Sequence, residues 1–188
     1  LLVTIPPNRG AAVITDSGLG DDSGFVPVNK YTLRSNIDPD VWVVGDAANV
    51  PTSKAGSVVH FEVQSFVPNF LATLEGGEPS IPFDGHANCF IESGRNEALL
   101  LDFNYDVEPL QGTFPLPRVG PMSLLKPTIL NHLGKRIFEW VYWNMLIKAR
   151  PLPFPRDMSM TGKKADDAHR AAYEAGRLAA KEALAGTP

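Results

Sequence analysis

The stretch VWVVGDA at residues 41–47 decides the fold class of this chain. Its four apolar residues stand between Pro39 and Gly45, a pattern typical of a short strand buried on both faces of a sheet. Gly45 and Asp46 then mark a turn, and residues 53–75 carry a helical pattern that ends at two glycines. A buried strand followed by a turn and a helix predicts an α/β fold.

Outward from this stretch, changes of pattern divide the chain into four parts. The α/β part covers residues 1–78, and its opening apolar run predicts a strand that ends at Pro6 and Pro7. Because the chain begins directly in this strand, we expect it to be the C-terminal piece of a longer polypeptide. The other three parts are a β-hairpin module, an amphipathic region and an Ala-rich helical tail, at residues 79–123, 124–164 and 165–188.

The parts after residue 78 predict an α+β module with amphipathic helices. Residues 88–92 and 97–104 have the pattern of two strands joined by the turn SGRN, whereas the Pro- and Gly-rich residues 106–123 predict a surface loop. Helices are expected at residues 127–148 and 166–185, the latter because alanine is the best helix former.

Composition excludes several classes of protein. The 188 residues are 44% hydrophobic and 20% charged, and no apolar run reaches the roughly 18 residues of a membrane-spanning helix. A single cysteine, Cys89, excludes an internal disulfide scaffold, and the four histidines lack the spacing of zinc ligands, so no metal site is expected.

A basic, aromatic segment predicts attachment to a membrane surface. Residues 111–164 hold nine basic and two acidic side chains, a net charge of +7 in a chain whose total is −4. Within them, residues 137–147 are dense in apolar and aromatic side chains, which prefer the headgroup level of a bilayer. We therefore expect peripheral binding through residues 124–150. Nucleic acid is not expected as a partner, because these aromatics cluster with aliphatic residues instead of alternating with arginine. A helix packed on a core is the alternative.

An ordered set of short motifs resembles the sulfide:quinone oxidoreductases, flavoproteins of the pyridine nucleotide-disulfide oxidoreductase superfamily. The set runs through about residues 1 to 150 and includes the stretch already quoted. Its other members are TIPP at residues 4–7, PTSKAGS at 51–57, FDGHANC at 83–89, LLLDFNY at 99–105, EPL at 108–110 and VYWNML at 141–146.

The resemblance implies the C-terminal part of a two-dinucleotide-binding-domain flavoprotein that carries FAD. Gly45 would let the backbone approach the cofactor, Asp46 would accept a hydrogen bond from a ribityl hydroxyl, and the following helix N-terminus would face the pyrimidine edge. The alternative is an ordinary Gly-Asp turn. The fingerprint G-x-G-x-x-G is missing, and SGLG at residues 17–20 lacks its strand and helix, so these residues form an incomplete site that needs an N-terminal FAD/NAD-type domain.

The resemblance also assigns roles to single residues. Cys89 would be one of the two cysteines that carry sulfur between sulfide and the flavin, with its partner outside these residues; a buried structural thiol is the alternative. Lys54 would stabilise negative charge near the flavin or the quinone oxygen, or it is a solvated loop lysine. Phe103 and Tyr105 would border the quinone, or they pack in the core.

Two side chains of the predicted helix could carry protons. His60 and Glu62 on the predicted helix could handle protons released or taken up at the quinone, although a lone histidine on such a helix is more often structural. His86 and His132 receive no role.

The leading hypothesis is a peripheral membrane oxidoreductase that takes electrons from sulfide through Cys89 and FAD to quinone. Self-association into a homo-oligomer is compatible with the sequence. A type II NADH:quinone oxidoreductase is one alternative, although hydride transfer from NADH needs no cysteine. A non-catalytic membrane-binding module is the other.

Overall fold

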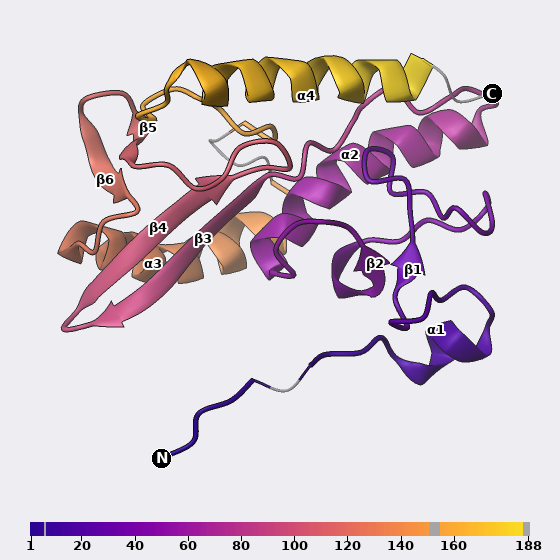
Figure 1. Ribbon diagram of the computed structural model, residues 1–188, viewed down its shortest axis with the longest axis horizontal. Coiled ribbons are helices and arrows are strands. Elements are labelled where there is room, and N and C mark those ends of the chain that lie inside the picture. Colours follow the sequence, from indigo (N-terminus) through magenta and orange to yellow (C-terminus); the bar gives the residue numbers. More distant parts are fainter. Residues whose placement is uncertain (6, 151–154, 186–188) are drawn as a thin grey trace.

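The computed structural model describes residues 1–5, 7–150 and 155–185 and has a mixed α/β fold. Helix α2 (Gly56–Leu74) and a four-stranded sheet form its middle, α3 (Ile129–Val141) packs on the sheet, and α4 (Asp167–Ala185) lies across the top (Figure 1). Three predicted features lie partly outside the described residues: Pro6 at the end of the opening strand, residues 151–154 of the amphipathic part, and residues 186–188 of the tail.

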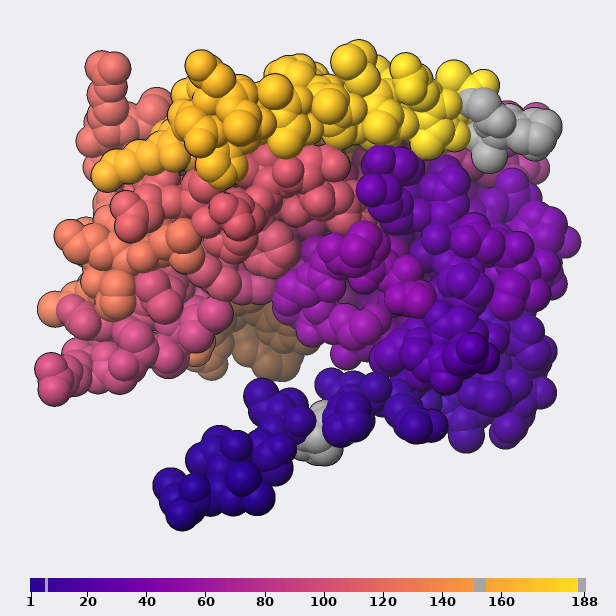
Figure 2. Space-filling view, viewed as in Figure 1, coloured from indigo at the N-terminus to yellow at the C-terminus, as the bar shows by residue number. Residues whose placement is uncertain are grey.

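The N-terminal part contains little regular sheet. A short helix, α1 (Ala12–Asp16), precedes β1 (Val26–Pro27), which pairs in parallel with β2 (Ala48–Asn49). The strand expected at the start of the chain is wrong: residues 1–5 are exposed and stand clear of the body (Figure 2). Within the described residues they pair with no neighbouring strand, and an extended segment without one cannot join a sheet.

The buried strand predicted at residues 41–44 is also wrong. Trp42 forms a single antiparallel bridge with Arg34, and the Val43 N–H donates to the Leu33 carbonyl. The neighbouring segment is irregular, so it offers isolated hydrogen bonds instead of a ladder. The apolar run instead packs against α2, where the Trp42 ring lies 5.6 Å from Phe66, and the 3₁₀ turn η1 (Gly45–Ala47) follows it.

Helix α2 confirms the prediction for this segment, with Pro68 inside the helix but without a break. Its buried face ties down the chain that returns from its end. The Asn69 side chain accepts hydrogen bonds from the N–H groups of Ser80 and Ile81 and donates to the Ile81 carbonyl. These hydrogen bonds fix residues 80 and 81, which lead to the first strand of the large sheet.

The predicted hairpin is present as β3 (Ala87–Gly94) and β4 (Glu97–Phe103), paired antiparallel. Its turn is shorter than SGRN: Arg95 and Asn96 alone connect the strands, both at positive φ, as a type I′ hairpin turn requires. Cys89 lies in β3 opposite Leu101 of β4.

The surface loop predicted at residues 106–123 is wrong, because two more strands form there. Strands β5 (Gly112–Leu116) and β6 (Gly120–Leu124) complete a sheet of order β3-β4-β6-β5, with β6 parallel to β4. Pro115 and Pro121 face each other across the β5–β6 pair. Strand β6 pairs with β4 only at Leu124. Pro121 therefore has no β4 residue opposite it, so the N–H that proline lacks costs no hydrogen bond to β4.

Both expected C-terminal helices are confirmed in outline. Thr128 caps α3 by accepting a hydrogen bond from the Asn131 N–H, and a π-helical turn, η2 (Tyr142–Leu146), continues it. Helix α4 approaches the body closely at Gly176, where an added Cβ would lie 1.8 Å from an Asp106 carboxylate oxygen. No helix in the described part of the chain has the length and hydropathy needed to cross a membrane.

Among the described residues, buried apolar side chains gather in two clusters, with Leu100 and Leu124 of the sheet outside both. The larger joins the turns before α2 to α2 itself and to the start of β3, and includes Leu33, Val58, Phe61 and Phe83. The smaller contains Val107, Leu110 and Met158, with Tyr173 of α4 packed against it. Since Val58 and Phe83 share one core, tertiary packing crosses residue 78; the predicted domain boundaries themselves stay a prediction.

Candidate functional site

The first turn of α2 brings the only cysteine next to the segment that follows η1. The Ser57 hydroxyl oxygen lies 3.6 Å from the Cys89 sulfur, so β3 meets the helix at this point. Cys89 is half-buried rather than enclosed. The thiol is therefore partly accessible, with the Ser57 hydroxyl as a polar neighbour.

The turn at Gly45 is built around a buried carboxylate. The Gly45 N–H donates to the Glu62 side chain at 2.5 Å, and Glu62 is 1% exposed. Burial raises the pKa of Glu62, partly offset by the Gly45 hydrogen bond and the charge of Lys54. Gly45 has φ +74°, and an added Cβ would lie 3.2 Å from Val59, so this close approach favours glycine. Asp46 beside it is exposed.

Lys54 holds this turn from within. Its ammonium donates to the Asp46 carbonyl at 2.9 Å and to the Ala48 carbonyl at 2.7 Å, and it lies 4.3 Å from the centre of the Phe25 ring. The positive charge is therefore fixed beside Asp46. Lys54 itself is exposed, and its role beside a flavin or a quinone stays a prediction.

Phe103 and Tyr105 are partly buried and pack against the larger core. Phe103 lies against the larger core, and the Tyr105 ring packs edge-on against Phe83 at 5.7 Å. The Tyr105 hydroxyl donates to the Lys30 carbonyl, and burial raises the pKa of Tyr105. Core packing accounts for both rings, and their role beside a quinone stays a prediction.

His60 and Glu62 lie on α2 with different surroundings. A His60 ring nitrogen is 2.8 Å from the Gln64 amide nitrogen, and burial lowers the pKa of His60. The Glu62 carboxylate accepts a hydrogen bond from the Gly45 N–H. Among the described residues, no group of three or more His, Cys, Asp or Glu side chains could hold a metal ion.

A buried ionic cluster that the sequence did not indicate lies beside the β3–β4 pair. His86 just before β3, Asp102 on β4 and Lys163 before α4 are 4%, 3% and 7% exposed. The Asp102 carboxylate accepts from a His86 ring nitrogen at 2.7 Å, from the Asn88 amide at 3.0 Å, and from the Lys163 ammonium. The one available signal was a charged residue inside the apolar run LLLDF.

The partners of His86 determine its charge. One ring nitrogen contacts the Asp102 carboxylate and the other the Arg156 carbonyl, both at 2.7 Å. Both partners only accept hydrogen bonds, so both ring nitrogens must carry a proton. Burial opposes this charge, but the hydrogen bond and charge of Asp102 outweigh it and raise the pKa of His86. The Asp102 pKa is lowered: burial raises it, and His86 and Lys163 more than compensate.

A cavity of about 250 Å³ adjoins this cluster and is lined by Ser57, the neighbour of Cys89, whereas Cys89 itself does not line it. One wall is apolar and comes from α2, β5 and α3. The other is polar and comes from β3, β4 and the segment before α4. The apolar wall includes Phe61, Phe114 and Phe138. The polar wall includes His86, Asn88 and Asp102.

No family model matches the chain, but curated proteins do. Mitochondrial sulfide:quinone oxidoreductases from Schizosaccharomyces pombe, Mus musculus and Dictyostelium discoideum are 29%, 30% and 28% identical over 79%, 79% and 80% of this chain. The resemblance to sulfide:quinone oxidoreductases is confirmed. The chain spans about a third (32%) of the length of each of these relatives.

The fold also has a counterpart among solved structures. A chain in the cryo-EM structure of the Tetrahymena thermophila mitochondrial ATP synthase, an F1Fo composite tetramer, matches with a TM-score of 0.53 and 20% identity, over 76% of this chain and 32% of that one. At this identity the likeness concerns the fold alone.

The site residues predicted from the resemblance to sulfide:quinone oxidoreductases lie in two separate groups in the structure. Helix α2 links Gly45, Asp46 and Lys54, which precede it, to Cys89, which touches its first turn. Phe103 and Tyr105 lie apart, in the core, and are not among the residues that line the cavity beside Cys89. The sequence patterns assigned no role to His86, Asp102 or Lys163.

Proposed function

We propose that this chain is the C-terminal portion of a sulfide:quinone oxidoreductase, a flavoprotein that oxidises sulfide and reduces quinone. The observation that carries the proposal is the position of Cys89 at the first turn of α2, the helix that follows the Gly45–Asp46 turn. The similarity to three curated sulfide:quinone oxidoreductases supports it. The two-dinucleotide-binding fold and the N-terminal FAD/NAD-type domain belong to this proposal.

The residues around Gly45 fit a flavin. The Asp46 carboxylate faces solvent, and the N-cap residue of α2, Ala55, makes no side-chain capping bond. Asp46 would bind a ribityl hydroxyl, and the N–H groups of the first turn would face the pyrimidine edge, where the helix dipole favours negative charge. When bound, FAD would supply a two-electron acceptor and donor. Lys54 fixes the Asp46 backbone for this contact.

Cys89 would provide the sulfur chemistry. In the oxidised protein its sulfur would form a disulfide with a second cysteine of the longer polypeptide. A hydrosulfide ion attacks one sulfur of this bond, its electron pair forms the new S–S bond, and the displaced cysteine leaves as a thiolate. The product is a cysteine persulfide and a thiolate, with no change in total electrons. The Ser57 hydroxyl, 3.6 Å from the Cys89 sulfur, would hydrogen-bond this sulfur.

The cavity beside Cys89 would receive the quinone ring. Its apolar wall of aromatic side chains suits a flat ring, and its polar wall can hydrogen-bond carbonyl oxygens. Phe138 of α3 lines it, so the helix expected at the membrane surface also borders the cavity. Phe103 and Tyr105 would support this region from the core.

The test is sulfide-dependent quinone reduction by the full-length protein, with NADH as the alternative donor. Sulfide should support reduction and NADH should not. Activity with NADH alone would favour the type II NADH:quinone oxidoreductase, and activity with neither donor would favour a non-catalytic module.

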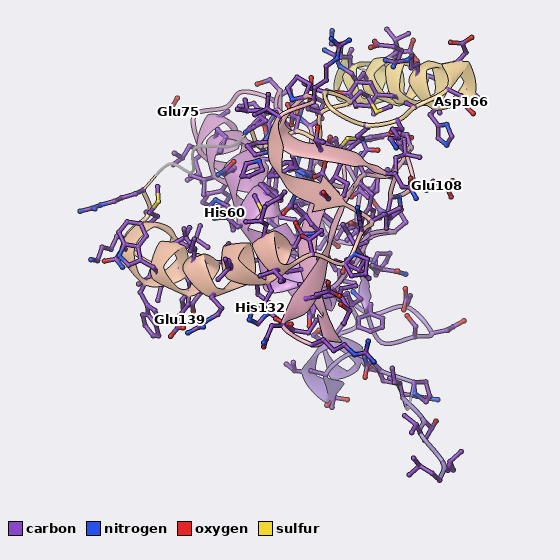
Figure 3. All side chains as sticks on the ribbon, turned by 90° about the vertical axis from the view of Figure 1, so that its left-hand side faces the viewer. His60, Glu75, Glu108, His132, Glu139 and Asp166 are labelled. Carbon is purple, nitrogen blue, oxygen red and sulfur yellow. The ribbon has the colours of Figure 1, made fainter. Side chains whose placement is uncertain are left out.

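The exposed stripe of α3 and η2 supports peripheral attachment to a membrane. Arg136, Lys148 and Arg150 are exposed close to it. In Figure 3, α3 lies across the front, with His132 near its start and Glu139 further along. The large apolar side chains that are at least 44% exposed there are Ile129, Leu130, Leu133, Ile137, Trp140, Tyr142, Trp143 and Ile147.

We expect the protein to bind anionic vesicles, and the double change Trp140→Ser and Trp143→Ser to weaken binding at least about tenfold at every salt concentration. Burying one large apolar side chain contributes about 1.5–3 kcal/mol, so losing two should exceed this threshold. Removing the charge of Arg136 should matter at low salt only. Leu178→Ser on α4, at a residue 59% exposed, is the control. Vesicle co-sedimentation measures binding, and equal binding by the double variant would contradict the proposal.

A further inference from the structure

Residues 155–163, which we call the strap, form part of the polar wall of the cavity beside Cys89. The strap alternates: Pro155, Asp157, Ser159 and Thr161 line the cavity, whereas Met158 and Met160 belong to the smaller core. The segment bends at residues 156–157 and turns at 161–162, so it presents alternate side chains to the cavity without being a regular strand. The hydrogen-bonding character of this wall therefore depends on where the strap is held.

In the described part of the chain, backbone pairing already joins the strap to β5, where the Thr113 N–H donates to the Gly162 carbonyl at 3.0 Å and Gly112 bridges to Lys163. Three contacts that involve side chains add to this pairing. The His86 ring donates to the Arg156 carbonyl at 2.7 Å, the Met158 N–H donates to the Asp84 carboxylate at 2.9 Å, and the Lys163 ammonium binds Asp102. The first and third meet at Asp102, because His86 donates its other N–H to the same carboxylate. The ring of His86 also stacks on Phe61 of α2, with centroids 4.2 Å apart and planes 16° apart.

Only the charged form of His86 can donate both of these hydrogen bonds, one to Arg156 and one to Asp102. A neutral imidazole has one N–H and one lone pair, so one of its two acceptor partners would face a lone pair. Loss of the proton would break either the link to the strap or the link to Asp102. The stacking on Phe61 prevents the ring from turning to another partner without losing packing.

We propose that His86, in its charged form, is a positioning residue that helps to fix the strap as the polar wall of the cavity and thereby sets the affinity for the electron acceptor bound there. The part that concerns the acceptor rests on the proposed function. His86 does not itself donate a proton to the acceptor, since both of its N–H groups are already used.

Other charged groups surround His86 and enter any pH dependence. Asp102 comes from β4, Asp84 from the segment before β3, and Lys163 and Asp157 from the strap. On α2, His60 and Glu62 flank the stacked Phe61. The carboxylates favour the imidazolium, so the positioned state should persist above the ordinary histidine pKa of 6.5 and weaken as pH rises through the raised value.

The test replaces His86 by phenylalanine, which keeps the stacking on Phe61 and removes both N–H groups. In the full-length protein, the KM for quinone should rise about ten- to hundredfold, because hydrogen bonds to a charged group are the strong ones. Flavin reduction by sulfide should remain close to wild type. His132→Phe is the matched control, since His132 pairs with Glu92 near the start of α3, away from the cavity.

Hydrogen–deuterium exchange tests the positioning without any activity. Backbone amides of residues 155–163 should exchange faster in His86→Phe than in wild type and in His132→Phe. Unchanged exchange would overturn the inference even if the enzyme reduces quinone. Faster exchange in a protein that never oxidises sulfide would leave the inference standing and remove the proposed function alone.

The wild type offers a second route if His86→Phe does not fold. Its KM for quinone should rise with pH above the raised pKa of His86, while flavin reduction by sulfide should not follow the same curve. A KM that stays flat across this range would overturn the inference.

Discussion

Sulfide-dependent quinone reduction by the full-length protein is expected to fall by several orders of magnitude when Cys89 is replaced by serine. Serine nearly preserves the volume of the side chain, so the contact with Ser57 and the strand pairing opposite Leu101 should survive. An alkoxide is far less accessible than a thiolate, and it cannot carry a sulfane sulfur. Steady-state reduction of quinone with sulfide measures the effect.

The control separates the two halves of the reaction. Flavin reduced by dithionite in Cys89→Ser should still be reoxidised by quinone, because the change lies on the donor side. Ser57→Ala removes the neighbouring hydroxyl but leaves the thiol, and it should cost far less activity. A Cys89→Ser protein that keeps most of its sulfide activity would make Cys89 a structural thiol.

Replacing Asp102 by alanine is expected to lower the free energy of unfolding by about 3–5 kcal/mol, the usual cost of removing one partner of a buried ion pair. Two buried cations, His86 and Lys163, would then face each other without the carboxylate between them. For a domain of this size the melting temperature falls by roughly 2–4 °C per kcal/mol. Thermal or denaturant unfolding measures the loss.

Asp157→Ala is the matched control. Asp157 pairs with Arg156 at the surface, and such pairs contribute about 0–1 kcal/mol. Equal losses from the two variants would contradict the account of a buried cluster centred on Asp102.

The same cluster should give the protein a stability maximum between two pH limits. The pKa of Asp102 is lowered on folding, so its contribution is present above the ordinary value of 3.8 and is lost as pH falls through the lowered one. The pKa of His86 is raised, so its contribution is complete below 6.5 and is lost as pH rises through the raised value. Both slopes should be weaker in Asp102→Ala.

Local patterns in the sequence predicted several elements correctly. Helices α2, α3 and α4 follow from periodicity, propensity and end signals, and the β3–β4 hairpin follows from two apolar runs around a short turn. These signals depend on residues close together in the chain, so no tertiary information is needed to recognise them.

Strand assignments that depend on partners were less reliable. Residues 41–44 have the composition of a buried strand but meet only an irregular neighbour, whereas the Pro-rich residues 112–124 form a strand pair because their prolines lie where β6 has no second partner. A strand exists only when another segment supplies its hydrogen bonds, and composition alone does not say which segment that is.

The sequence by itself determined the resemblance to sulfide:quinone oxidoreductases, the helices, the hairpin and the candidate residue Cys89, since all of these reside in short, ordered motifs. Only the tertiary structure decided that Phe103 and Tyr105 pack in the core and that His86, Asp102 and Lys163 form one buried cluster. The members of that cluster lie 16 and 61 residues apart. Their charges are stabilised by one another in a desolvated interior, and such a contact between distant segments leaves no local pattern in the chain.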